Sequence, residues 1–167
     1  PIRVAWVGTR TLDRAREALR GASGVHLTSD VGTVAAHPDV DIVVELIGGI
    51  EPARTFVLDA IAHGKHVVTA NKALLALHGN EIFAAAHAKG VMVAFEGAVA
   101  GGIPIIKALR EGLTANRIEW IAGIINGTSN FILSTMRATG ASFASVLAEA
   151  QKRGYAEADP TFDVEGI

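Results

Sequence analysis

The 167-residue sequence contains no cysteine. Disulfide bonds, thiolate metal sites and catalysis by a cysteine nucleophile are therefore excluded, and the absence fits a reducing compartment such as the cytoplasm. No uninterrupted apolar run reaches the roughly 18 residues that a transmembrane helix needs. Basic and acidic residues are intermixed, with a net charge of -2, so no basic stripe marks a nucleic-acid interface. We therefore expect a cytoplasmic protein that binds neither nucleic acid nor a membrane.

What the sequence does contain is an alternation of two hydrophobic patterns. Hydrophobic residues make up 50% of the chain and the mean hydropathy is +0.35, which predicts a folded core. Apolar runs predict buried strands at 2–7, 41–47, 65–70 and 91–95, and the stretches between them predict helices at 12–20, 30–36, 52–63, 73–77 and 80–89. This alternation predicts a parallel sheet covered by helices, which is an α/β fold.

The stretch Phe95–Pro104 (FEGAVAGGIP) separates two parts of the chain. It holds three glycines, and Glu96 is its only charge. Such a loop is either a hinge or a phosphate cradle, and its position after the fourth predicted strand favours the hinge. Beyond it, the pattern predicts a helix over 106–113, a strand over 117–125, a helix over 127–139, a helix capped by Ser142 and a final loop. We therefore predict two domains, 1–102 and 103–167.

Four groups of residues follow the predicted strands at their carboxyl ends, which is where open parallel sheets bind ligands. A dinucleotide site would account for all of them. They are Thr9–Arg10, Glu45 with Gly48–Gly49, Asn71–Lys72 and the stretch 95–104. The usual G-x-G-x-x-G signature is nevertheless absent, because Gly8 is followed by Thr9, Arg10 and Thr11.

Arg10 gains a role if residues 2–7 form the second strand of such a fold. The end of that strand normally meets the adenosine ribose, where an arginine accommodates the 2′-phosphate of NADP. This interpretation predicts a strand, a glycine loop and a helix upstream of residue 1. The alternative is that Arg10 is a solvated loop charge.

Lys72 follows a predicted strand by two residues and opens a helix. An ammonium group in that position can hydrogen-bond an oxygen of a substrate or cofactor and take part in proton transfer. The alternative is a surface lysine in a first helical turn. The tail carboxylates bind either a ligand amine or solvent. They do not form an EF-hand, because the sixth position of a loop that starts at Asp159 is Val164 instead of glycine.

Four segments resemble homoserine dehydrogenase, in the order in which that family contains them. They are Gly64–Lys72 (GKHVVTANK), Phe95–Ile106 (FEGAVAGGIPII), Gly123–Phe131 (GIINGTSNF) and Gly154–Asp163 (GYAEADPTFD). The resemblance is specific from Asp41 onward and looser before it. It implies a partial Rossmann-type parallel sheet, followed by the start of an α+β catalytic and dimerisation domain.

The resemblance also implies an activity: NAD(P)-dependent interconversion of L-homoserine and L-aspartate 4-semialdehyde, in threonine, methionine and isoleucine biosynthesis. Lys72 matches the family's cofactor-contacting and catalytically relevant lysine. Glu157 matches its substrate-binding glutamate, and Gly154 lies in the same loop near cofactor and substrate. The family's site for a monovalent cation, typically Na+, is matched by Glu96, Val99, Gly101 and Ile103. The family forms homodimers or larger assemblies.

Parts of the family pattern are missing from these residues. The missing parts are the glycine-rich diphosphate loop, the substrate-binding aspartate and the acid–base lysine. In the family, the aspartate and the lysine follow the position of Ile167. We therefore expect an internal fragment of the enzyme, inactive by itself. The alternative is a truncated, non-catalytic module with an NADP-binding or regulatory role. Aspartate semialdehyde dehydrogenase is disfavoured because its chemistry needs a cysteine nucleophile.

Overall fold

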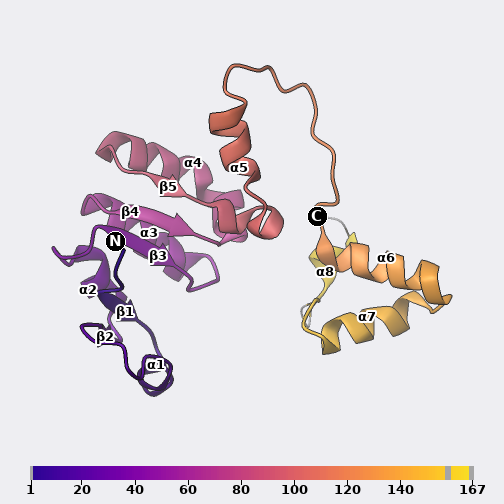
Figure 1. Cartoon of the computed structure of the whole chain (residues 1–167), viewed down its shortest axis with the longest axis horizontal. Coiled ribbons are helices and arrows are strands. Elements are labelled where there is room, and N and C mark those ends of the chain that lie inside the picture. The colour runs from indigo at the N-terminus through magenta and orange to yellow at the C-terminus, as the bar shows by residue number, and fades with distance from the viewer. Residues whose placement is uncertain (1, 157–158, 166–167) are drawn as a thin grey trace. The chain divides into compact units, whose positions relative to one another are not determined.

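The computed structural model describes residues 2–156 and 159–165. The chain divides into two compact units, Pro1–Ala115 (unit 1) and Asn116–Ile167 (unit 2), which are described separately (Figure 1). Within the described residues, no helix combines the length and apolar character needed to cross a membrane. Glu157, the predicted substrate-binding residue, lies outside the described residues.

Unit 1 alternates strands and helices, and all of its strand pairs are parallel (Figure 1). One sheet pairs β1 with β2, and a second has the order β3-β4-β5. The strands are β1 (Trp6–Gly8), β2 (His26–Thr28), β3 (Ile42–Glu45), β4 (His66–Thr69) and β5 (Val93–Ala94). The helices between the strands are α1 (Leu12–Ala18), α2 (Val31–Ala36), α3 (Glu51–Ala62) and α4 (Lys72–Lys89). After β5 come four short helical segments: η1 (Glu96–Ala98), η2 (Ala100–Gly102), α5 (Ile105–Lys107) and the π-helical η3 (Ala108–Gly112). The predicted α/β class is confirmed.

Local capping determines where the helices of unit 1 begin and end. Asp30 accepts a hydrogen bond from Gly32 N at the start of α2, and Pro52 occupies the first turn of α3. Gly90, with a φ of 67°, ends α4. The sequence predicts two helices at 73–77 and 80–89, and this is wrong, because α4 is one helix of 18 residues. Gly79 lies inside it, since a single glycine costs a packed helix only about 1 kcal/mol.

The core of unit 1 joins one face of the β3-β4-β5 sheet to α2, α3 and α4. The predicted apolar face of α3 is confirmed: all four of its members are buried, namely Phe56, Val57, Ala60 and Ile61. Exposure alternates along β3, with Val43 buried while Ile42 and Val44 are 47% and 57% exposed. The prediction of buried strands is therefore wrong for one face of β3 and β4, because the helices of the described chain cover one face only, and for residues 2–7, where β1 begins only at Trp6 and Ile2 is 94% exposed.

Unit 2 contains the helices α6 (Gly127–Thr139), α7 (Phe143–Lys152) and α8 (Thr161–Glu165). The predicted start of α7 is confirmed, since the Ser142 hydroxyl accepts a hydrogen bond from Ser145 N. A small core joins α6 and α7, formed by Ile132, Val146, Ala150 and Ala156.

Two predictions for unit 2 are wrong. Residues 117–125 form no strand, and the tail predicted as a loop contains α8. A strand requires a neighbour that pairs with its backbone, and no described residue supplies one; Trp120 is 77% exposed and Ile125 93%. In the tail, Asp159 Oδ1 accepts a hydrogen bond from Thr161 N at 3.1 Å, a local stabilisation that hydrophobic periodicity does not reveal.

Candidate functional site

The carboxyl ends of β3 and β4 lie side by side and carry the polar residues of the candidate site. The parallel register pairs Glu45 with Thr69. Each of these two residues is only 1% exposed. The loops that follow them lead directly into α3 and α4. The register thus places a buried carboxyl group beside a buried hydroxyl group, at the edge where parallel sheets bind ligands.

The Glu45 carboxyl group is the centre of this edge. Thr69 Oγ1 donates a hydrogen bond to Glu45 Oε2 at 2.6 Å. Ile47 N and Gly48 N donate to Oε1 at 2.7 and 3.3 Å. Among the described residues, no lysine, arginine or histidine forms an ion pair with Glu45. In the part of the chain that the structure describes, the hydrogen-bond donors to this carboxyl group are therefore all neutral.

Asn71 closes these contacts into a ring. Its backbone N donates to Thr69 Oγ1 at 3.0 Å, and its Nδ2 donates to the Gly49 carbonyl at 2.7 Å. Its Oδ1 accepts from Leu74 N at 3.1 Å and so caps α4. We call the closed set the strand-end ring: Glu45, Ile47, Gly48, Gly49, Thr69 and Asn71. The ring joins the loop before α3 to the loop before α4.

Lys72 is the first residue of α4 and is exposed. A helix N-terminus carries a partial positive charge, so a cation there is disfavoured by about 0.3–1 kcal/mol. Helix stability therefore gives no reason for a lysine at this position. Backbone N–H groups and an ammonium group together suit a negatively charged or oxygen-rich ligand.

The predicted cation-binding residues lie in the turns after β5. Glu96 directs its carboxyl group at the start of α5, accepting from Ile106 N at 3.0 Å and from Lys107 N at 3.2 Å. Ile103 O already accepts one hydrogen bond, from Ile105 N at 2.8 Å. Ile103 O retains a second lone pair, whereas Glu96 Oε1 also accepts a longer hydrogen bond from Lys107 N at 3.5 Å. The donor set consists of oxygen only, which fits a hard cation, and no cluster of three or more acidic, histidine or cysteine residues occurs among the residues described.

Arg10 lies just beyond the carboxyl end of β1 and is exposed. Gly8, the last residue of β1, packs tightly on α2: a Cβ atom there would lie 3.1 Å from Val31 Cγ1. No carboxyl group in the described part of the chain forms an ion pair with Arg10. Arg10 thus follows a strand end, as expected, but this strand belongs to the β1-β2 sheet, whereas Lys72 follows β4 of the other sheet.

Unit 2 contains a second polar cluster, at the N-terminus of α6. Asn126 Oδ1 caps the helix by accepting from Ser129 N at 2.9 Å, and Asn126 Nδ2 donates to Asp163 Oδ1 at 2.8 Å. Thr128 Oγ1 donates to the Tyr155 carbonyl at 2.6 Å. These bonds attach both ends of the segment that contains Glu157 to α6.

Two further features describe the tail of unit 2. Gly154 follows α7 with a φ of 75°, in the left-handed region that favours glycine. Hydrogen bonds from the hydroxyl and backbone N–H of Thr161 lower the pKa of Asp159. The carboxyl group of Asp159, two residues after Glu157 in the sequence, therefore keeps its charge to a lower pH than an ordinary aspartate does.

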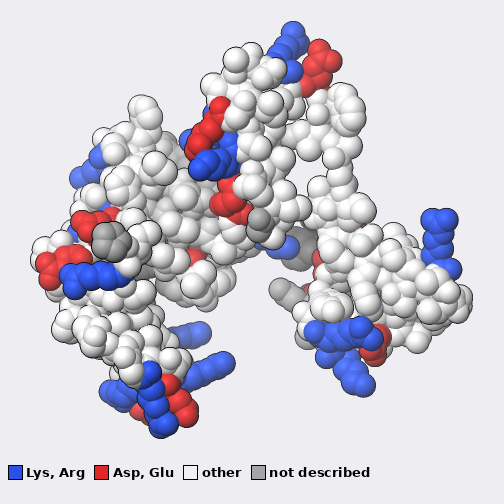
Figure 2. All heavy atoms as spheres, in the orientation of Figure 1, with Lys and Arg blue, Asp and Glu red and all other residues white. Residues whose placement is uncertain are grey.

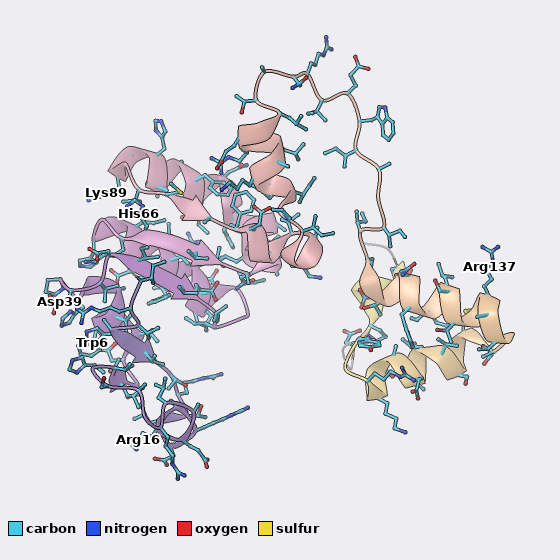
Figure 3. The ribbon with its side chains drawn as sticks, in the orientation of Figure 1. Trp6, Arg16, Asp39, His66, Lys89 and Arg137 are labelled. Atoms are coloured by element: carbon cyan, nitrogen blue, oxygen red, sulfur yellow. The ribbon has the colours of Figure 1, made fainter. Side chains whose placement is uncertain are left out.

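Basic and acidic side chains are intermixed on the face that Figure 2 shows. Figure 2 shows basic and acidic side chains side by side on the same face, for example on α1. Figure 3 labels His66, which begins β4 at the end of the strand away from Thr69. Its Nδ1 accepts a hydrogen bond from Met92 N at 3.0 Å, so His66 stabilises the sheet and does not belong to the strand-end site.

Residues 1–96 match the family model described as "Homoserine dehydrogenase, NAD binding domain", and residues 104–167 match the model described as "Homoserine dehydrogenase". The chain belongs to the homoserine dehydrogenase family. Homoserine dehydrogenase from Pseudomonas aeruginosa is 71% identical over 141 residues, which are 84% of this chain and 32% of the relative. The resemblance inferred from the four sequence segments is confirmed.

Solved structures of the family agree with this assignment. The crystal structure of a homoserine dehydrogenase from Thiobacillus denitrificans superimposes with a TM-score of 0.90 at 71% identity, and covers 99% of this chain and 38% of that one. A hyperthermophilic archaeal homoserine dehydrogenase in complex with NADPH superimposes with a TM-score of 0.76 at 27% identity, over 92% of this chain and 49% of that one. The chain thus spans 32–40% of the length of the curated relatives that it matches.

Family membership and geometry together sort the predicted residues. Lys72, Arg10 and the cation-binding set belong to unit 1, and Gly154 belongs to unit 2. Sequence reasoning did not predict the roles of Thr69, Asn126 and Asp163 in the hydrogen-bond networks. The sequence signal for Asn126 was its place before a predicted helix start, which favours a capping asparagine. No sequence signal links Thr69 to Glu45, because that contact depends on strand register.

Proposed function

We propose that the complete gene product is an NAD(P)-dependent homoserine dehydrogenase, which interconverts L-homoserine and L-aspartate 4-semialdehyde. Family membership of both units is the observation that carries this proposal. In the oxidative direction the terminal carbon of homoserine loses a hydride and its hydroxyl loses a proton, which yields the aldehyde. The bound nicotinamide cofactor supplies the hydride acceptor. The residues of this chain bind, orient and assist proton transfer.

Lys72 is the residue that we assign to the reacting groups. Its ammonium group donates hydrogen bonds to an oxygen of the cofactor or substrate and stabilises negative charge there. Its place at the start of α4, where a cation does not favour helix stability, supports the assignment. Arg10 is the proposed partner of a 2′-phosphate, which would favour NADP over NAD.

Unit 2 supplies the proposed substrate contacts. Glu157 accepts hydrogen bonds from the amino group of homoserine, and Gly154 lies near cofactor and substrate. The bonds from Asn126 to Asp163 and from Thr128 to Tyr155 support this role, because they attach described residues on either side of Glu157 in the sequence to the start of α6.

The cofactor-binding unit lacks the G-x-G-x-x-G loop in residues 1–167. A doubly wound sheet has the strand order 3-2-1-4-5-6, and removal of its first strand leaves the pairs 3-2 and 4-5-6. The observed pairings β2-β1 and β3-β4-β5 match this remainder. They support the prediction of a strand, a glycine loop and a helix that precede residue 1, with the strand lying between β1 and β3.

A monovalent cation, typically Na+, is proposed to bind oxygens of Glu96, Val99, Gly101 and Ile103. Positive φ values at Ala100 (53°) and Gly101 (48°) turn the backbone sharply there, which supports convergence of carbonyl oxygens. The test is to titrate NaCl against tetramethylammonium chloride at constant ionic strength. Glu96→Gln should raise the Na+ concentration for half-maximal activity. An unchanged Na+ dependence contradicts the proposal.

The proposed activity is tested with the complete gene product and L-homoserine, by following NADPH formation and then NADH formation. We expect turnover in the complete gene product and none in the isolated 167-residue chain. A fluorescence titration with NADPH separates the alternative, since a non-catalytic module binds NADPH tightly and shows no turnover in either form. Normal turnover by the 167-residue chain would contradict the expectation that it is inactive alone.

We also propose a cytoplasmic homodimer or larger assembly. The exposed apolar side chains of residues 117–125, such as Trp120 and Ile125, support an additional contact in the assembled enzyme. Light scattering after size-exclusion chromatography measures the assembly, and a monomeric complete gene product contradicts it.

A further inference from the structure

The Glu45 carboxyl group is difficult to explain by stability alone. It is 1% exposed, and burial of a carboxyl group is costly unless its hydrogen bonds compensate. Val43, two residues earlier on the same face of β3, shows that an apolar side chain fits this face. A buried acidic group without a cationic partner in the described chain therefore points to a role beyond filling the core.

The ring binds two backbone N–H groups and one carbonyl group of the glycine loop before α3. Gly48 and Gly49 have positive φ values of 73° and 70°. Ile47 N and Gly48 N both donate to Glu45, and the Gly49 carbonyl accepts from Asn71. The N–H groups of Ile47 and Gly48 therefore point at Glu45, whereas in an anion-binding glycine loop such groups point at the ligand. These bonds attach the loop to Glu45 of β3 and to Asn71, which follows β4.

Through Asn71, the ring determines where α4 begins. The two side-chain atoms of Asn71 bind different elements: Oδ1 caps α4 at Leu74 N, and Nδ2 holds the Gly49 carbonyl. Lys72 follows Asn71 directly as the first residue of the helix. The backbone of Lys72 is therefore attached to β3 by the continuous path Glu45–Thr69–Asn71.

We propose that Glu45 is a positioning residue that acts through Thr69 and Asn71 to hold Lys72 at the cofactor site. This inference rests on the proposed role of Lys72 in the homoserine dehydrogenase reaction. Thr69 is the central link, because its hydroxyl donates to Glu45 and accepts from Asn71 N. A valine at position 69 keeps the shape and breaks both bonds.

The test is a double-mutant cycle on the complete gene product, with Thr69→Val, Lys72→Ala and the double variant. The readouts are the NADPH dissociation constant from fluorescence titration and kcat/KM for homoserine. Thr69→Val should weaken NADPH binding about tenfold, as expected when a buried hydrogen-bond partner is removed. In the Lys72→Ala background it should add less than about twofold, because Thr69 acts through Lys72. Thr69→Ser keeps the hydroxyl and should recover most of the affinity.

Val43→Ala is the matched control, because Val43 is buried in β3 outside the ring. It should lower thermal stability and leave the NADPH dissociation constant within about twofold of wild type, the range expected for a destabilised variant that remains folded. Hydrogen exchange of peptides covering 46–50 and 70–74 should accelerate in Thr69→Val and not selectively in Val43→Ala.

The outcomes separate the positioning role from the proposed function. Multiplicative losses in the two single variants, or unchanged NADPH affinity in folded Thr69→Val, overturn the positioning role while wild-type turnover with homoserine remains. If the wild-type protein does not turn over homoserine but the effects of Thr69→Val and Lys72→Ala on NADPH affinity are coupled, the substrate assignment is overturned and the positioning role is supported. Loss of affinity in Val43→Ala equal to that in Thr69→Val reduces the ring to a purely structural feature.

Discussion

The link between α6 and the tail gives a prediction that can be worked out from individual contacts. Asn126 makes two of them, a cap on Ser129 N at 2.9 Å and a bond to Asp163 Oδ1 at 2.8 Å. Loss of an N-cap costs about 1 kcal/mol. A hydrogen bond to a charged carboxyl group contributes about 1.5–3 kcal/mol when buried, and we take about 1 kcal/mol because both side chains are partly exposed.

Asn126→Ala removes both contacts and should cost about 2 kcal/mol, which corresponds to roughly 30-fold faster exchange of the α6 amides through local opening. Asn126→Ser retains a capping hydroxyl and loses only the bond to Asp163, so it should give about fivefold faster exchange. Hydrogen exchange with mass spectrometry on peptides covering 127–139 of the complete gene product measures both effects.

The same variants should raise KM for homoserine, because Asn126 binds Asp163, six residues after the proposed substrate-binding residue Glu157 in the sequence. Ser142→Ala is the matched control. It removes the Ser142 hydroxyl, which caps α7 by accepting a hydrogen bond from Ser145 N at 3.3 Å, and it leaves the bond between Asn126 and Asp163 unaffected. We expect it to destabilise α7 and leave KM unchanged. Equal exchange rates in Asn126→Ser and wild type would refute the energetic reasoning. An equal rise of KM in Ser142→Ala would refute the link to the substrate.

Two further predictions concern the packing and charges of unit 1. Leu74→Ala should lower the free energy of unfolding by about 2–5 kcal/mol in urea titrations, since Leu74 is fully buried, whereas Leu77→Ala, at a position 66% exposed, should change it by less than about 0.5 kcal/mol. The hydrogen bond and charge of Arg54 lower the pKa of Glu81. This pair therefore stabilises the fold at pH values above the ordinary carboxyl pKa of 4.5. The stabilisation is lost as the pH falls through the lowered pKa. The difference in unfolding midpoint between wild type and Glu81→Gln should therefore be present at neutral pH and disappear in acid; a difference that grows in acid would contradict it.

Features that depend on neighbouring residues were predictable from the sequence. Asp30 and Ser142 cap helices through contacts two or three residues away, and the apolar face of α3 follows from helical spacing alone. The place of Lys72 at a strand–helix turn was predictable for the same reason. The strand predicted over 117–125 failed because an apolar pattern forms a strand only when a neighbouring strand pairs with it.

The sequence by itself determined the family, the alternation of strands and helices, and the position of Lys72 at the start of a helix. Motifs and caps are read along the chain, where bonded neighbours lie close together. Only the tertiary structure revealed that Glu45 and Thr69, which are 24 residues apart, share a hydrogen bond. That contact follows from the register of β3 and β4, which is set by packing of the whole sheet against its helices. The same packing left one face of β3 exposed, which no local pattern indicated.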